Sequence, residues 1–177
     1  IKEVSRIEFP KTVKDVIKAR VSRLDDECQN ILTLASFVGN DFTFEALLGV
    51  TGVEENRLLE LTEKLLKTGL VKEQVIRGKD VYCFADIIVR DVVHEEVSHL
   101  RHKKLHGSVG NALEKVYAQD VDQHFGELAY HFLEAGDNDK AISYFLKAGE
   151  KAQKVYAHNE AFSYLQHALE LLEEKAP

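Results

Sequence analysis

The sequence predicts a mainly α-helical chain with one small β-hairpin near its middle and an array of helical hairpins after it. Three observations support this fold class. Only two prolines occur among the 177 residues, Pro10 and Pro177, so none interrupts the apolar periodicity between them. That periodicity is helical except over residues 70–84, where two short β-branched runs flank a turn. Near the C-terminus, large and small side chains alternate across two helical stretches. At 45% hydrophobic residues, the chain can bury one core or two small ones.

The first elements follow from apolar stripes and capping residues. Residues 1–10 are expected to form a linker. An apolar stripe over residues 11–24 predicts a helix rich in Lys and Arg. Asp25 or Asp26 can cap the next helix, which we expect to end at Gly39.

A helix-turn-helix is predicted next. Thr43 can cap a short helix over residues 44–48, and the Gly-containing turn 49–52 leads into a second helix over about 53–68. Gly69 is expected to end this second helix.

Two strands are predicted after the helices, over residues 70–76 and 81–84, with residues 77–80 as the hairpin turn. Three helices and a hairpin in this order describe a winged-helix domain. We assign that domain to residues 11–85.

Residues 86–120 are predicted to form connecting helices, because the helical period returns there. Apolar residues recur over 87–97 and again over 100–116.

Residues 121–177 carry nearly the spacing of a tetratricopeptide repeat (TPR), a pair of antiparallel helices that stacks against its neighbours. The pattern is Phe125-x2-Leu128-Ala129-x2-Phe132 followed by Ala141-x3-Phe145-x2-Ala148, with Gly136 between the two helices. A further helix is expected over about 158–174. It reads as half of a degenerate second repeat, and we expect its partner helix to follow beyond Pro177.

Composition excludes some classes of partner. The net charge is −7, from 23 Lys and Arg against 30 Asp and Glu, which argues against a general affinity for nucleic acid or anionic membrane. No apolar run approaches the roughly 20 residues that span a bilayer. Cys28 and Cys83 suggest no disulfide framework, so a cytoplasmic location is expected. Because the chain begins at Ile1 and contains no Met, we expect it to be a segment of a longer protein.

Five motifs, in this order, cover nearly the whole chain. They are Pro10-x2-Val13-x2-Val16-Ile17-x2-Arg20-x2-Arg23-Leu24, Leu34-Ala35-x3-Gly39-x2-Phe42, Phe84-x5-Arg90-Asp91-x-Val93-x-Glu95, Arg101-x4-His106, and His131-Phe132-x2-Ala135-Gly136-Asp137-x2-Lys140-Ala141. Together they resemble the arm of the signal-transduction ATPases with numerous domains (STAND NTPases).

The resemblance implies a winged helix that packs against an upstream ATPase domain, and repeats that receive a protein partner or effector. ATP or ADP with Mg²⁺ would bind in the full-length parent, and no cofactor is expected in this segment. Many relatives have a His where this chain has Asp86. A carboxylate repels phosphate, so we do not assign nucleotide sensing to Asp86.

Winged helices often bind DNA, but the charges of this one oppose that function. The helix that would enter the major groove carries Glu54, Glu55, Glu60 and Glu63 against Arg57, Lys64 and Lys67. The wing offers Lys72, Arg77 and Lys79 against Glu73 and Asp80. The first helix is the basic one, with Lys11, Lys14, Lys18, Arg20 and Arg23, and we interpret it as a solvated face or a docking surface for the ATPase domain.

Metal and catalytic motifs fail on inspection. His94-Glu95-x3-His99 departs by one residue from the zinc-protease pattern, so the two His would not share a helix face. His99, His102 and His106 do fall on one face and could bind a metal on geometry alone. We favour an exposed basic stripe with Arg101, Lys103 and Lys104, because no Cys or carboxylate completes a ligand set. Asp137-Asn138-Asp139 lacks the Gly and distal Glu of a calcium loop and is interpreted as a turn and helix cap.

The sequence therefore predicts a non-catalytic regulatory and protein-interaction segment of a larger signal-transduction NTPase. It predicts no catalytic, cofactor-binding or metal-binding residue here. The alternative is a DNA-binding winged-helix regulator whose repeats serve dimerisation, and a purely structural role for the repeats also stays open.

Overall fold

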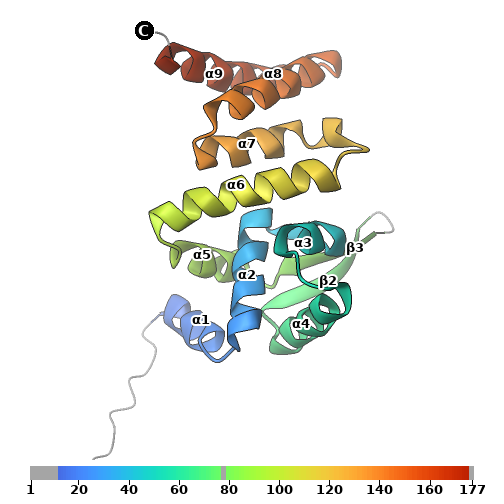
Figure 1. The fold of residues 1–177 in the computed structure, drawn as a ribbon, viewed down its shortest axis with the longest axis vertical. Coiled ribbons are helices and arrows are strands. Elements are labelled where there is room, and N and C mark those ends of the chain that lie inside the picture. The colour runs from blue at the N-terminus through green and yellow to red at the C-terminus, as the bar shows by residue number, and fades with distance from the viewer. Residues whose placement is uncertain (1–11, 77–78, 176–177) are drawn as a thin grey trace, which may run out of the picture.

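The computed structural model describes residues 12–76 and 79–175 as a mainly helical molecule with one small antiparallel sheet (Figure 1). The sheet and the helices around it form one end of an elongated molecule. The later helices are layered above that end in chain order, so the blue and red parts of the chain lie at opposite ends (Figure 1). In the described part of the chain, no helix combines the length and the apolar character needed to cross a membrane.

The first end of the molecule contains four helices and three strands. Their bounds are α1 Val13–Val21, α2 Asp26–Val38, β1 Asp41–Thr43, α3 Phe44–Thr51, α4 Glu55–Thr68, β2 Val71–Ile76 and β3 Lys79–Phe84. The sheet order is β1-β3-β2, with both pairs antiparallel, so that Phe42 lies opposite Tyr82 and Val71 opposite Phe84.

The capping residues act as their sequence positions predict. Asp25 begins α2 by accepting a hydrogen bond from the backbone N–H of Cys28 at 2.8 Å. Thr43 begins α3 by accepting one from Ala46 at 3.2 Å. Gly69 ends α4 in the left-handed conformation, with φ of 66°.

Two predictions about this end are wrong in detail, and one strand was not predicted. The short helix does not stop at residue 48, because α3 continues to Thr51 and includes Gly49. The third strand, β1, was not predicted. The hairpin turn is shorter than expected, because β3 already begins at Lys79 and pairs there with Ile76, while residues 77–78 lie outside the described part.

Two helices follow, over the residues where the apolar period predicts helix. They are α5 Ile87–Glu95 and α6 His99–Val116. Asp86 caps α5 by accepting a hydrogen bond from Ile88 N–H at 2.9 Å. α6 contacts α2 and α3 on one side and the next helix on the other, so it joins the two ends of the molecule (Figure 1).

The remaining elements are η1 Val121–Gln123, α7 Phe125–Ala135, α8 Asn138–Lys154 and α9 His158–Lys175. From α6 to α9, each helix packs against the one before it, and successive helices run in alternating directions (Figure 1). The side chains of the predicted large-and-small pattern are buried, except that Phe125 is half-buried: Leu128, Ala129, Phe132, Ala141, Phe145 and Ala148. Asp137 caps α8 by accepting a hydrogen bond from Lys140 N–H at 3.1 Å, which confirms its predicted role.

Candidate functional site

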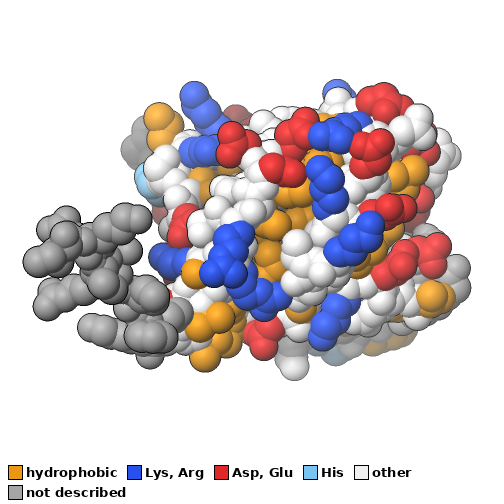
Figure 2. Space-filling view, turned by 90° about the horizontal axis from the view of Figure 1, so that it is seen from below, with side chains coloured by type: hydrophobic (Ala, Val, Ile, Leu, Met, Phe, Trp, Pro, Cys, Tyr) orange, Lys and Arg blue, Asp and Glu red, His pale blue; other side chains and the backbone are white. Residues whose placement is uncertain are grey.

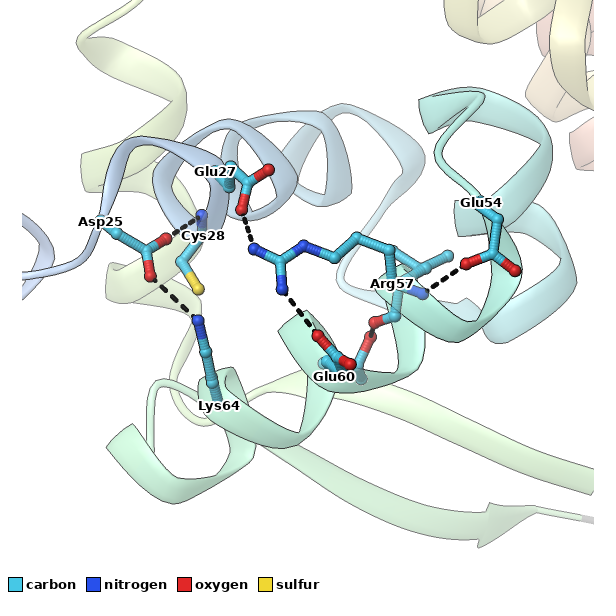
Figure 3. Close-up of polar contacts among 9 residues, drawn as sticks. Asp25, Glu27, Cys28, Glu54, Arg57, Glu60 and Lys64 are labelled. Atoms are coloured by element: carbon cyan, nitrogen blue, oxygen red, sulfur yellow. Dashed lines mark hydrogen bonds and ion pairs between the residues drawn. The ribbon is translucent and has the colours of Figure 1, made fainter.

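On α4, the helix predicted to read DNA in the alternative function, two of the three cations pair with carboxylates (Figure 3). The guanidinium of Arg57 contacts both Glu27 of α2 and Glu60 of α4. Lys64 lies 3.3 Å from a carboxylate oxygen of Asp25. A DNA phosphate would have to displace these carboxylates, so the face is poorly suited to the major groove.

The basic first helix is also engaged within the molecule. Lys14 and Lys18 of α1 pair with Glu95 and Glu96 at the end of α5, at 2.9 and 3.3 Å. Arg20 donates a hydrogen bond to the carbonyl oxygen of Thr68 at 2.7 Å, at the C-terminus of α4, where a cation is favourable. Lys11 lies outside the described residues.

Charges of both signs surround an uncovered strip of hydrophobic side chains at this end of the molecule (Figure 2). On α1, Val13 and Val16 contribute exposed apolar surface. The surface is therefore suited to contact with another protein domain more than to binding a polyanion.

The last helix, α9, has a second apolar face that nothing in the described residues covers. Ala161, Ala168 and Leu171 are buried, and α9 packs mainly on α8. Phe162 is 71% exposed, and Leu169 and Leu172 are also exposed. A helix that is apolar on two sides is typical of a helix packed between two neighbours.

Four of the eight histidines meet near the junction of the connecting helices with the rest of the molecule. His94 lies on α5 and His102 and His106 on α6, and each offers a ring nitrogen within 4.8 Å of those of the other two. His131 of α7 completes the group, with its Nδ1 3.1 Å from Nδ1 of His106. Here we call His94, His102 and His106 the histidine cluster.

Phe37 of α2 packs against all three rings of the histidine cluster. Its ring centroid lies 4.2, 5.0 and 4.9 Å from those of His94, His102 and His106. Phe37 is itself buried, so its ring shields one side of the cluster from solvent.

The surroundings favour neutral imidazoles. Burial, with a smaller effect of His131, lowers the pKa of His106 to about 3. Burial, with the nearby Arg90, lowers the pKa of His131 to about 4. The pKa of His94 is also lowered, first by burial and then by His102.

A hollow of about 550 Å³ opens beside the histidine cluster. Its lining includes His94 and His102 of the cluster, together with His99, Glu95 and Glu134. Solvent or a small ligand can therefore reach one side of the cluster, while Phe37 closes another.

The structure rearranges the histidines that the sequence singled out. His94 and His99 lie on different helices, so the near match to a zinc-protease helix has no structural meaning. His99 is exposed and outside the cluster, and its place is taken by His94. The predicted exposed basic stripe is wrong for His106, which is buried, whereas Arg101, Lys103 and Lys104 are exposed.

Helical spacing could not find His94, because the turn after α5 brings it beside α6 from another helix. His131 was likewise noted only as part of a repeat motif. The sequence did contain one signal for the cluster: His94, His99, His102 and His106 lie close together on both sides of the boundary between α5 and α6.

Comparison with known proteins identifies no family. No family model matches the chain. The chain is similar to an uncharacterized protein of Rhizobium meliloti (strain 1021), with 24% identity over 161 residues. This match covers 89% of the chain and only 15% of the length of that relative.

Proposed function

We propose that this chain is a non-catalytic regulatory and protein-interaction segment of a larger signal-transduction NTPase. In this proposal α1 to β3 form a winged helix that docks on an ATPase domain in the same cytoplasmic chain. The helices α7 to α9 form TPR-like repeats that receive a protein partner or effector. ATP or ADP with Mg²⁺ would bind upstream, in the parent protein.

The observation that carries the proposal is the serial packing of α6 to α9, which leaves one apolar face of α9 exposed, with Phe162, Leu169 and Leu172. Helical repeats of this kind present extended surfaces for contact. Further support comes from the similar relative, whose length greatly exceeds the matched region.

The ion pairs of α4 favour docking over DNA binding. Arg57 and Lys64 already neutralise neighbouring carboxylates, and the helix keeps additional acidic residues. Docking to a protein domain uses complementary charges and apolar contact. Charged side chains of both signs beside hydrophobic ones on this end of the molecule support that role (Figure 2).

Coupling would work through two arrangements of the parent protein that differ by a few kcal/mol. The bound nucleotide would favour one of these arrangements through its effect on the winged helix. A partner bound to the repeats would favour one of them from the other end of the molecule.

Hydrogen exchange of the parent protein tests the coupling. We expect the amide protection of α1 and α4 to differ between the ADP-bound state and the state with a non-hydrolysable ATP analogue. Identical protection of both helices in the two states would contradict the proposal.

A mobility-shift experiment at low salt tests the DNA-binding alternative with the 177-residue chain. We expect no retardation of duplex DNA. Retardation that weakens as the salt concentration rises would contradict the proposal and favour the DNA-binding regulator.

A further inference from the structure

We propose that His94, His102 and His106 form a binding site for one divalent transition-metal ion of the zinc class, with its fourth coordination position open to the adjacent hollow. This site is independent of the proposed function.

The ligand set suits such an ion. Three imidazoles and one open position make a well-known coordination of Zn²⁺, whereas Mg²⁺ and Ca²⁺ prefer oxygen ligands. A metal requires the neutral imidazole, and burial already favours this form for His94 and His106.

The distances are close to those required. With Zn–N bonds of about 2.0–2.1 Å, the nitrogens of a tetrahedral site lie about 3.3 Å apart. The three ring nitrogens lie within 4.8 Å of one another. Each nitrogen therefore has to move by less than about 1 Å, which side-chain rotation can supply.

The cluster also has a supporting shell. Nδ1 of His131 lies 3.1 Å from Nδ1 of His106, a contact that orients the His106 ring. Phe37 packs on all three rings and holds them next to one another. Ligand orientation by such neighbours is typical of metal-binding histidines.

The charges around the site are of both signs. Arg90 and Lys103 disfavour a cation, whereas Asp91, Glu95 and Glu134 favour one. Glu95 and Glu134 line the hollow, where a water molecule on the metal would lie.

Packing alone is the competing explanation, since the rings also fill space around Phe37. Packing does not explain why the space is filled by imidazoles, because burying a polar ring costs desolvation free energy that an apolar side chain of the same size would not cost. It also does not account for a cluster that borders a hollow.

The first experiment titrates the chelator-treated 177-residue chain with Zn²⁺ in a calorimeter. We expect saturable binding of one ion per chain that excess Mg²⁺ or Ca²⁺ does not prevent. With Co²⁺ as the probe, we expect the intense visible absorption of a four-coordinate ion in place of the weak absorption of the aqueous ion. Absence of one-to-one Zn²⁺ binding would overturn the proposal.

The second experiment compares substitutions of two half-exposed or exposed histidines that border the same hollow. His102→Gln should weaken Zn²⁺ binding at least about 100-fold, since even loss of an outer partner typically costs 10–100-fold. His99→Gln should leave the affinity within about 2-fold, because His99 lies outside the cluster. His94→Gln should behave as His102→Gln does.

Thermal unfolding gives a readout that does not depend on the affinity assay. Zn²⁺ should raise the melting temperature of the wild type and of His99→Gln, but not of His102→Gln. Far-UV circular dichroism confirms that each variant is folded. Equal binding by wild type and His102→Gln, or equal loss in His99→Gln and His102→Gln, would assign the cluster to packing.

Discussion

At the scale of single residues, Gly49 shows that a glycine can mark either a turn or a point of close helix packing. The sequence suggested a turn at Gly49, because glycine and the nearby Gly52 often follow a helix. In the structure Gly49 lies inside α3, and a Cβ atom there would be only 2.4 Å from Cγ2 of Val116 on α6. The missing side chain lets α3 approach α6, which is a fact of tertiary packing that local sequence does not contain.

Substitution of Gly49 by Ala should therefore destabilise the protein. The clash cannot be relieved cheaply, because valine in a helix strongly prefers one χ1 rotamer. Overpacking of this kind costs about 1–3 kcal/mol, partly offset by the roughly 1 kcal/mol helix preference of Ala over Gly. Urea unfolding should show a net loss of up to about 2 kcal/mol.

Gly107→Ala is the matched control, since Gly107 lies in α6 and a Cβ there would meet its nearest atom at 3.5 Å. It should stabilise the protein by up to about 1 kcal/mol. If both substitutions changed stability in the same direction, close packing at Gly49 would be refuted.

The buried pair His106 and His131 predicts a pH dependence of stability in the metal-free protein. The pKa of both side chains is lowered from the ordinary 6.5, mainly by burial, so the unfolded chain binds more protons below that pH. The stabilisation is fully present above about pH 6.5 and is lost as the pH falls. Each group contributes a slope of up to about 1.4 kcal/mol per pH unit.

Urea unfolding between pH 7.5 and 5 measures that slope. His131→Gln should reduce it, whereas His158→Gln should not, because His158 is exposed. A stability that does not change over this range would contradict a neutral buried pair.

At the scale of elements, the sequence located most helices within a few residues, because caps and apolar periodicity are local signals. It missed β1, which is only three residues long and has one buried side chain, Phe42. So short a strand carries no period, and it exists because β3 offers a partner about 40 residues later. The histidine cluster was found only in part, because His102 and His106 share α6 whereas His94 comes from α5.

Thr43 joins the two kinds of element, as the last residue of β1 and the cap of α3. Thr43→Ala should cost about 1 kcal/mol, because the N–H of Ala46 loses its partner. Thr43→Ser keeps the hydroxyl and should cost only a few tenths of that amount. Chemical unfolding of the two variants compares them directly, and equal losses would exclude a capping role.

At the scale of the whole molecule, the helices from α6 onward are arranged in series, so interior helices have two neighbours and α9 mainly one. In such arrays stability is approximately a sum over neighbouring pairs. The ion pair between Lys175 and Asp139 adds a contact at the end of α9, but it is exposed and therefore weak.

Native-state hydrogen exchange should show this gradient. We expect the amides of α9 to exchange through a local opening that needs less free energy than exchange in α6. The substitution Ala168→Gly, in the buried face of α9, should widen the difference, and Gln166→Gly, on its exposed part, should widen it less. Equal protection of α6 and α9 would show that the molecule opens as one unit.

The central helix, α6, gives the molecule a mechanical property. Its 18 residues span about 27 Å. One flank touches the sheet-bearing end and the other touches the stacked helices. A tilt of only 10° about one tip would displace the opposite tip by about 5 Å. A slight rotation of α6 on the sheet-bearing end would therefore move the helices stacked on its other flank by nearly the height of a helical turn.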